Sequence, residues 1–446
     1  MASAELDPVG AACRSAALSA AVDAGLLRVP ETIEDKPMAL FYDLDAWERN
    51  LANIRALFGS HWLHACAAKT NPLFWFLRRE KALGHGAECA SIAEVVAALE
   101  NGFAPENVVF DSPSKTIPEI RYALEKGVHL NMDNLQELDR VVDLLPGLQL
   151  GEQQVLGLRL NPLVGAGSIA AFSVSTGKSK FGVPLYPDPK YQAELVQRVT
   201  KASFLNCIHV HTGSGGMGLK QLVSGVRAAV DFAKAVNEAA GHQQVRIIDI
   251  GGGLSTNFED DTLTPSFSEY ADALRQEVPE IFDASQFERV ISEFGASCHI
   301  KFGWLASRIE YIKECDGGRI ALIHAGSEIF LRSSYCPDTF MKHRVLPFDA
   351  TGRPKAATDL IPHDIAGPLC FAGDVVVRDA MLPPMDQGDI VMLMDAGGNT
   401  LSLHTTHCSR QMPSVFGYRQ LPDASFTFET LKGPQLIKDT IGVWRP

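Results

Sequence analysis

Residues 85–134 read HGAECASIAEVVAALENGFAPENVVFDSPSKTIPEIRYALEKGVHLNMDN. Three short runs in this stretch are typical of strands, and the two segments between them carry apolar residues at helical spacing, as in IAEVVAALENG and IPEIRYALEKG. Short strand–helix units that alternate in this way imply a parallel sheet. The stretch therefore predicts an α/β fold.

The same alternation continues on both sides, about eight times between residues 40 and 300. About eight such units predict a closed (β/α)8 barrel of the TIM type. The alternative is an open doubly wound sheet, which would need a phosphate-binding loop after its first strand. The glycine-rich loop of this chain, residues 251–253, comes late in the series and favours the barrel.

Helical periodicity fades after residue 300, where runs of strand character alternate with turn residues. We expect a β-rich C-terminal domain there, with residues 343–364 as its most loop-like stretch. Near the N-terminus, residues 11–27 predict an amphipathic helix and residues 38–45 predict a strand. The predicted fold is thus an α/β barrel followed by a β-rich domain.

Composition narrows the classes of function. The formal net charge of -13 disfavours nucleic-acid binding, and nine cysteines without a CxxC pair indicate free thiols in a reducing compartment. The N-terminus does not have the pattern of a basic, apolar leader, and no run of about 20 apolar residues follows. We therefore expect a cytoplasmic protein that binds neither nucleic acid nor membrane.

Two charged residues stand at strand ends that a barrel turns toward its active face. Lys69 follows the apolar run HACAA, where partial dehydration would lower the pKa of its amine and make it nucleophilic. Glu293, in VISEFGAS, would face a positively charged ring nitrogen. The alternatives are a surface lysine and a solvated loop glutamate.

Other candidates are weaker when taken alone. Amides of the glycine run 251–253 and the hydroxyl of Ser214 would approach a phosphate. His211 would stack on a flat ring, although a histidine at a strand end is more often structural. Cys370, in PLCFAGD, would deliver a proton, although a buried strand cysteine is usually inert packing.

Together these segments resemble the ornithine and diaminopimelate decarboxylase family, which is built on the alanine-racemase-like barrel. The similarity runs from about Phe41 to Tyr418 and is carried by AAKTNP, GAECASIAEV, GLRLNP, KSKFGV, HTGSG, DIGGG, SEFG, CFAGD and MDAGG. The resemblance implies that the cofactor is pyridoxal 5′-phosphate (PLP) and that the reaction is the decarboxylation of a small amino acid.

The resemblance also implies roles for single residues. Lys69 would carry PLP as a Schiff base, Glu293 would face the ring nitrogen, His211 would stack on the ring, and Cys370 would protonate the product carbon. These four are the predicted catalytic residues. The other predicted cofactor-binding residues are Glu88, Arg159, Ser214, Gly251, Gly252, Gly253, Gly295 and Asn399.

The family's architecture implies three parts. Residues 1–40 would be a helix and strand that join the C-terminal domain, residues 41–300 the PLP-binding barrel, and residues 301–446 a β-rich domain that contributes to the partner's active site. The protein would then be a homodimer with shared active sites, each combining Lys69 of one chain with Cys370 of the other. No metal ion is expected.

Three positions depart from the family pattern. Ala296 stands where the family usually has arginine, and Asn399 stands where it usually has tyrosine, so the phosphate of PLP would be held differently. Phe371 replaces the acidic residue that reads a distal ammonium group. Substrates with a distal primary amine are therefore disfavoured, unless Asp374 takes over.

An aromatic face at Phe371 suits an apolar group or a methylated cation instead. Arg332 resembles the family's basic residue that reads a distal carboxylate, and Tyr335 lies close to it in the sequence. The predicted substrate residues are Arg332, Tyr335, Phe371 and Asp374.

Three alternatives stay open. A PLP-dependent racemase on this barrel would use a tyrosine base, and none stands in the run Gly397-Gly398-Asn399. A non-catalytic regulatory homologue of a decarboxylase would account for Ala296 and Asn399. A metal-dependent hydrolase would account for the HxH pair of His209 and His211, but we expect no matching acidic and histidine set at the strand ends.

Overall fold

The computed structural model describes residues 10–151, 153–336 and 341–446. It divides into two compact units. Unit 1 contains the described residues up to Asn50, Thr256–Leu263 and those from Cys298 onward, and unit 2 contains Leu51–Ser255 and Thr264–Ser297. The predicted boundaries at 40/41 and 300/301 place the short segment Thr256–Leu263 in the barrel, whereas this segment belongs to unit 1.

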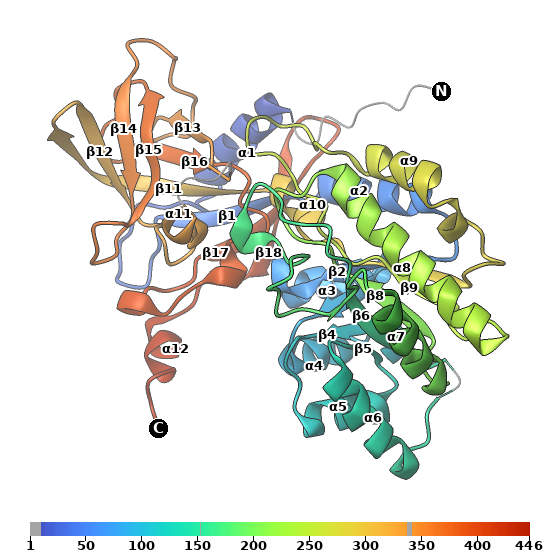
Figure 1. Ribbon diagram of the computed structural model, residues 1–446. Helices are drawn as coiled ribbons and strands as arrows, with labels where there is room; N and C mark the ends of the chain where they lie inside the picture. The colour runs from blue at the N-terminus through green and yellow to red at the C-terminus, as the bar shows by residue number, and fades with distance from the viewer. Residues whose placement is uncertain (1–9, 152, 337–340) are drawn as a thin grey trace. The chain divides into compact units, whose positions relative to one another are not determined.

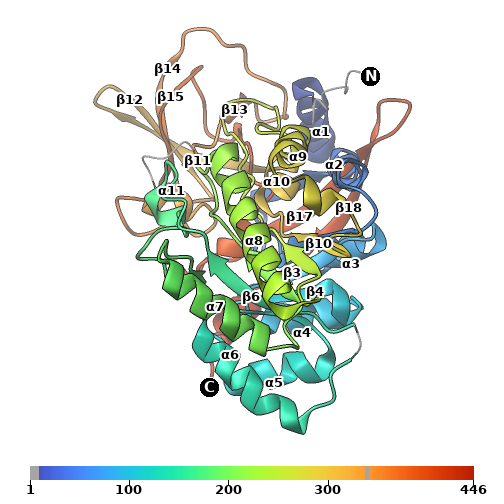
Figure 2. The same cartoon turned by 45° about the vertical axis from the view of Figure 1, so that its right-hand side comes forward.

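Unit 2 is built around a parallel barrel (Figures 1 and 2). The pairings of β5 with β6 and of β10 with β2 close the ring. This confirms the predicted (β/α)8-type barrel. Its strands are β2 (Trp62–Ala67), β3 (Gly86–Cys89), β4 (Val108–Asp111), β5 (His129–Met132), β6 (Leu156–Asn161), β8 (Cys207–Val210), β9 (Ile247–Asp249) and β10 (Arg289–Ser292), and the short β7 (Val183–Pro184) pairs with β6.

Helices surround these strands, and local sequence explains several of their ends. Thr116 and Ser266 each form a capping box with the glutamate three residues later, and Gly127 ends its helix in the left-handed conformation. The helices are α2 (Leu44–Phe58), α3 (Phe74–Ala82), α4 (Ile92–Glu100), α5 (Ile117–Lys126), α6 (Leu135–Leu144), α7 (Pro189–Lys201), α8 (Leu219–Ala240) and α9 (Phe267–Glu277), with short 3-10 turns η1 (Ala68–Thr70), η2 (Pro105–Asn107), η3 (Leu145–Gly147), η4 (Ala170–Phe172) and η5 (Pro279–Phe282).

The centre of unit 1 is a mixed sheet in the order β15-β14-β12-β11-β1-β17-β18, in which β16 pairs with both β11 and β13. The strands are β1 (Met38–Asp43), β11 (Gly303–Cys315), β12 (Gly318–Ile323), β13 (Val345–Phe348), β14 (Ile361–Ala366), β15 (Val375–Leu382), β16 (Ile390–Leu393), β17 (Ser414–Gln420) and β18 (Phe426–Lys432). The remaining helices are α1 (Ala11–Asp23), α10 (Ala296–His299), η6 (Ile300–Phe302), α11 (Arg332–Tyr335), η7 (Leu401–Leu403), η8 (His407–Ser409) and α12 (Ile437–Gly442).

The predicted strand at residues 38–45 is β1, and it lies in this sheet rather than in the barrel. It pairs antiparallel with β11 and parallel with β17, and all six of its residues are buried. A core of Phe41, Trp304 and Tyr418 packs around it, with the rings of Phe41 and Trp304 stacked at 4.4 Å.

Three local predictions were wrong. The helix predicted for residues 11–27 ends at Asp23, because Gly25 takes a left-handed backbone with φ of +70°. The stretch predicted as loop, 343–364, contains β13, a run of four residues interrupted by Pro347, and its last four residues begin β14. Cys370 lies on an exposed loop, because β15 begins only at Val375.

Among the described residues, no helix combines the length and apolar character needed to cross a membrane.

Candidate active site

The chemistry-bearing side chains of unit 2 gather at the carboxyl ends of the barrel strands. Lys69 lies in η1, directly after β2, and Glu88 lies in β3. Asp111 is the last residue of β4, His209 lies in β8, and Glu293 follows β10. Because all strands of the barrel are parallel, these ends share one mouth.

Lys69 is paired with Glu88. The Lys69 Nζ lies 2.6 Å from Glu88 Oε2, and the carboxylate is buried while the lysine side chain is 48% exposed. The apolar surroundings oppose the charge on Lys69, but the carboxylates of Glu88 and Glu293 outweigh them and raise the pKa of the amine. The predicted lowering of this pKa was therefore wrong, because the strand-end argument did not include a buried carboxylate on the next strand.

Glu88 itself responds to the same surroundings. Burial raises the pKa of its carboxyl to about 7, although Lys69 opposes the shift. Its second oxygen, Oε1, has no hydrogen-bond partner. Glu88 is thus a buried carboxyl whose ionisation depends on the amine beside it.

Glu293 is held close to the loop of Lys69. The Ala67 N–H donates to the carbonyl oxygen of Phe294 at 3.0 Å, and a Cβ at Gly295 would lie 2.2 Å from Thr70 Oγ1. Burial opposes the negative charge of Glu293, but His209 outweighs it and holds the pKa of the carboxyl below its usual value. Glu293 is therefore a buried, ionised carboxylate at the mouth that contains Lys69.

The triple glycine fits tightly between two other strand ends. A Cβ at Gly252 would lie 2.2 Å from the carbonyl oxygen of Glu293, and one at Gly253 would lie 2.0 Å from that of Gly213. Gly251 and Gly253 also have positive φ, +65° and +97°. Glycine is therefore required here by the fold itself, whatever else the loop binds.

His211 and Ser214 form the adjoining wall. The Gly252 N–H donates to His211 Nδ1 at 3.1 Å, and the other ring nitrogen lies 3.4 Å from Ser214 Oγ. Burial, with the nearby charge of Arg159, lowers the pKa of His211 to about 3. The imidazole is thus neutral, and its orientation is fixed by the glycine loop.

The guanidinium of Arg159 is paired with carboxylates of the protein itself. Its Nη1 lies 2.8 Å from Asp111 Oδ2 and 3.8 Å from Asp133 Oδ1, and the guanidinium lies 4.5 Å from the ring centroid of Phe181. Its side chain is almost fully buried. The predicted contact with the cofactor stays a prediction, and the contact with Asp111 was not predicted.

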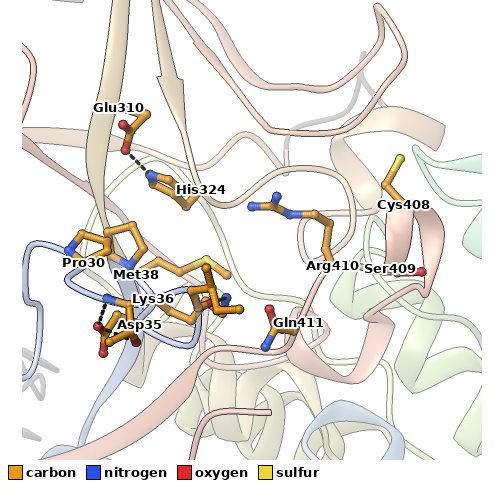
Figure 3. Close-up of a pocket in the computed structure, with 13 residues that line it drawn as sticks. Pro30, Asp35, Lys36, Met38, Glu310, His324, Cys408, Ser409, Arg410 and Gln411 are labelled. Atoms are coloured by element: carbon orange, nitrogen blue, oxygen red, sulfur yellow. Dashed lines mark hydrogen bonds and ion pairs between the residues drawn. The ribbon is translucent and has the colours of Figure 1, made fainter. Parts of the chain in front are cut away.

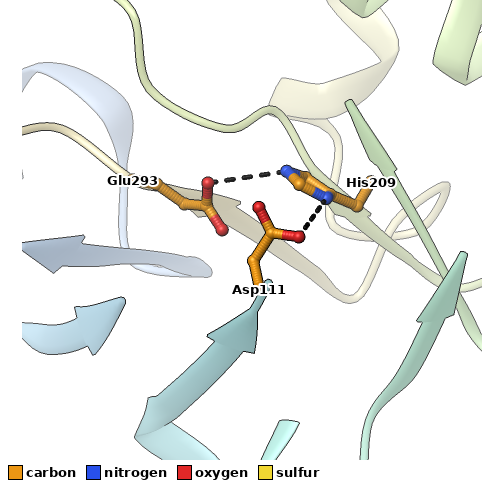
Figure 4. A group of neighbouring side chains, drawn as sticks. All are labelled: Asp111, His209 and Glu293. Atoms are coloured by element: carbon orange, nitrogen blue, oxygen red, sulfur yellow. Dashed lines mark ion pairs between the residues drawn. The ribbon is translucent and has the colours of Figure 1, made fainter. Parts of the chain in front are cut away.

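Asp111, His209 and Glu293 form a compact buried group (Figure 4). His209 Nδ1 lies 3.8 Å from Asp111 Oδ1, and His209 Nε2 lies 3.5 Å from Glu293 Oε2. The expectation that no acidic set accompanies the HxH pair was therefore wrong. Asp111 and His209 stand at strand ends like Lys69, so the signal that found Lys69 could also have found them.

Burial opposes a charge on His209, but Glu293 and Asp111 raise the pKa of its imidazole to about 9. His209 is therefore protonated at neutral pH. Its two ring nitrogens face the carboxylates of Asp111 and Glu293.

The residues present fit PLP. The mouth offers an amine at Lys69, an ionised carboxylate at Glu293 and a neutral flat ring at His211. Glu293 Oε1 is a buried oxygen without a hydrogen-bond partner, as expected where a protonated ring nitrogen would bind.

The other predicted residues lie in unit 1. Cys370 and Phe371 are exposed on the loop between β14 and β15, and the Phe371 ring lies 6.2 Å from that of His407. Asn399 follows two buried glycines and has φ of +53°. Tyr335, in α11, is 49% exposed, and Arg332 Nη1 lies 3.7 Å from Met341 Sδ.

Asp374 is bonded to the backbone of its own unit, and its predicted contact with a substrate stays a prediction. Its Oδ1 accepts the N–H of Ser327 and its Oδ2 accepts that of Leu369, both at 2.6 Å. The side chain is buried, and a Cβ at Gly326 or Gly367 would collide with it. Both oxygens are thus used to hold the loop that carries Cys370, a role that sequence spacing does not reveal.

Unit 1 also contains an open pocket of about 410 Å³ (Figure 3). Lys36, Arg410 and His324 line it, and His324 Nε2 lies 2.9 Å from Glu310 Oε2. No predicted site residue lines this pocket, so it is not the candidate active site.

Known proteins resemble the chain over most of its length. The model for the pyridoxal binding domain of pyridoxal-dependent decarboxylases matches residues 44–299. A diaminopimelate decarboxylase of Helicobacter pylori is 27% identical over 83% of this chain and 87% of its own length, and that of Deinococcus radiodurans is 29% identical over 84% and 88%.

Solved structures agree on the fold. The diaminopimelate decarboxylase of Helicobacter pylori, crystallised with L-lysine, matches with a TM-score of 0.77 at 24% identity, over 92% of this chain and 97% of that one. An arginine decarboxylase of Paramecium bursaria Chlorella virus matches with a TM-score of 0.70 at 19% identity, over 90% and 99%.

The fold and the mouth define a barrel enzyme that uses an aldehyde cofactor. Because the family model covers more than half of the sequence, the assignment can be made more specific. The chain belongs to the pyridoxal-dependent decarboxylase family. It is a carboxy-lyase, and its cofactor is PLP.

Proposed function

We propose that this enzyme decarboxylates an amino acid whose side chain does not end in a primary ammonium group. One observation carries this proposal. Position 371 has phenylalanine in place of an acidic residue, and Asp374, the nearby acid that would replace it, accepts a backbone N–H at each of its two oxygens. Burying an ammonium group without a partner costs several kcal/mol. The exposed ring of Phe371 suits an apolar group or a methylated cation instead.

The barrel mouth would hold the cofactor through residues of unit 2. Lys69 would hold it covalently, Glu293 would lie opposite its ring nitrogen, and the neutral ring of His211 would stack on it. Ser214 and the amides of the glycine loop would bind its phosphate. When bound, PLP supplies a protonated ring that accepts the electron pair released as the carboxylate leaves.

Two residues would move protons. Lys69 must lose a proton before it can act as a nucleophile, and Glu88 Oε2, 2.6 Å away, is positioned to accept it. Cys370 Sγ would deliver a proton to the carbon that has lost its carboxylate. We propose that this thiol comes from the partner subunit's Cys370 in a homodimer, with Arg332 and Tyr335 beside the substrate's side chain and Gly295 and Asn399 beside the cofactor.

The test has two parts. The purified protein with PLP should show the visible absorbance of a lysine-bound cofactor, which Lys69→Ala removes and the exposed control Lys201→Ala keeps. CO2 release is then measured across basic, acidic, apolar and onium amino acids. Diaminopimelate is included because the similar proteins are named diaminopimelate decarboxylases. Fastest turnover of ornithine, lysine or diaminopimelate would contradict the proposed specificity.

Other outcomes would point to the alternatives. Deuterium uptake from solvent into the substrate without CO2 release would indicate a racemase. A colourless protein that gains no absorbance with added PLP would indicate a regulatory homologue, which Ala296 and Asn399 would then explain.

A further inference from the structure

Four buried side chains form a line across the interior of the barrel. Arg159 contacts Asp111 at 2.8 Å, Asp111 faces His209 at 3.8 Å, and His209 faces Glu293 at 3.5 Å. They come from β6, β4, β8 and the residue after β10, so the line connects four separate strands (Figure 4 shows its last three members). The line ends at the carboxylate proposed to face the ring nitrogen of PLP.

His209 is the centre of this line. Neither of its ring nitrogens has a hydrogen-bond partner, although the side chain is fully buried. Buried polar atoms without partners are rare and destabilising. What surrounds this ring instead is negative charge on two sides, from Asp111 and Glu293, which holds the imidazole in its charged form.

Other charged or titratable groups face the same interior. They are Lys69, Glu88, Lys115, His129, Arg159, His211 and Asp249. Burial and Glu293 raise the pKa of Asp249, whose Oδ1 accepts the N–H of Gly251 and whose Oδ2 accepts from the side-chain amide of Asn131. Arg159 offsets the charge of Asp111, which leaves the attraction between His209 and Glu293 as the contact nearest the cofactor site.

We propose that Asp111 and His209 are positioning residues, which fix the Glu293 carboxylate in place and keep it ionised opposite the ring nitrogen of PLP. This inference rests on the proposed function. His209 Nε2 lies 3.5 Å from Glu293 Oε2, and the other oxygen of Glu293, Oε1, is buried without a hydrogen-bond partner. Asp111 acts through His209, since its other oxygen is bonded to Arg159.

A metal ion would be the competing occupant. The side-chain atoms of Asp111, His209 and Glu293 all lie within 4.8 Å of one another, a spacing that would also suit a cation. A metal ligand must be a neutral histidine, however, and Asp111 already shares its charge with Arg159. The proton on His209 therefore fits these surroundings better than a metal ion.

The experiment follows the ring nitrogen directly. Wild-type, Asp111→Asn and His209→Asn proteins are loaded with PLP carrying 15N in its ring, and the 15N chemical shift is recorded from pH 6 to 9. In the wild-type protein the ring nitrogen should stay protonated, and in both variants it should lose its proton at lower pH. PLP affinity should fall about tenfold or more in each.

Asp133→Asn is the matched control, because Asp133 is a second carboxylate beside Arg159 that does not contact His209. It should leave the 15N titration unchanged. The double variant Asp111→Asn/His209→Asn should behave as His209→Asn alone, because the two residues act as one unit. Identical titrations for Asp111→Asn and Asp133→Asn, or additive effects in the double variant, would overturn the proposal.

Two further measurements keep the test decisive. If the variants do not fold, histidine-labelled wild-type protein is examined at pH 8: a doubly protonated His209 supports the proposal, and a neutral one overturns it. A stoichiometric metal ion whose removal by chelator changes the 15N signal would also overturn it. If wild-type protein never binds PLP through lysine, the proposed function itself has failed, and that result is distinct from the others.

Discussion

Lys69 and Glu88 form an ion pair in which each residue shifts the pKa of the other. Glu88 is the nearest source of the raised amine pKa, through both its charge and its hydrogen bond. The amine attacks an aldehyde only when it is neutral, so the rate of PLP attachment should rise as pH rises through this pKa.

Glu88→Gln should therefore move that rise to lower pH, because removing the carboxylate lowers the pKa of Lys69. The measurement is the rate of covalent PLP attachment to the PLP-free protein between pH 6 and 10. Glu94→Gln is the control, since Glu94 Oε2 accepts the N–H of Ala90 and is not paired with Lys69. A profile that stays in place or moves to higher pH would refute this account.

Single residues also show what the sequence could predict. Position after an apolar strand made Lys69 and Glu293 candidates, because every parallel strand of a barrel ends at the same mouth, and the resemblance to the family gave them their predicted roles. It was not enough to fix their pKa values, which depend on which strands become neighbours. Asp111 and His209 are far apart in the sequence, and only closure of the barrel brings them to Glu293.

At the scale of structural elements, the glycine loop after β9 packs tightly against its neighbours. Gly252 has no positive φ, so alanine there is excluded by contact alone: its Cβ would lie 2.2 Å from the carbonyl oxygen of Glu293. Gly252→Ala should destabilise the protein by roughly 1–3 kcal/mol and weaken PLP binding, as seen in the melting temperature and in absorbance titrations.

Gly177→Ala is its control, because no atom lies within 4 Å of the Cβ it would add. Equal melting temperatures and equal PLP affinities for the two variants would show that the loop moves aside without effect. The motif alone suggested phosphate binding for these glycines, whereas their tight fit against residues 213 and 293 depends on the packing of β8, β9 and β10.

The loop between β14 and β15 is a second such element. Asp374 holds it through two backbone amides, so Asp374→Asn should loosen the loop by roughly 1–3 kcal/mol, because an amide nitrogen replaces one of the accepting oxygens. Hydrogen–deuterium exchange should increase in peptides covering residues 326–330 and 367–374.

Asp364→Asn is the control: Asp364 Oδ1 accepts the N–H of Asp379 on an exposed part of the same two strands, and asparagine keeps one oxygen that can accept it, so those peptides should stay unchanged. A higher KM for Asp374→Asn without any change in exchange would instead restore Asp374 as a substrate contact. The sequence placed this aspartate near Cys370 but could not show that its oxygens were already in use.

At the scale of the whole molecule, the alternation of strands and helices was sufficient to predict the barrel but not the membership of every strand. The run at residues 38–45 looks like the first strand of the series, yet β1 pairs with β11 and β17. Its partners lie more than 250 residues away in the sequence, and burial of all six of its residues gives no periodicity that would distinguish the two sheets.

The proposed assembly makes a further prediction for the whole molecule. If each active site combines Lys69 of one subunit with the partner subunit's Cys370, then Lys69→Ala and Cys370→Ala, each nearly inactive alone, should complement each other. Random exchange of subunits in an equal mixture gives about half mixed dimers, each with one intact site, and hence about a quarter of wild-type activity.

The measurement is CO2 release after the two variants are unfolded and refolded together, compared with each variant refolded alone. Activity that stays at the level of the separate variants would show that Lys69 and Cys370 serve the same site from one chain, or that no subunit is shared.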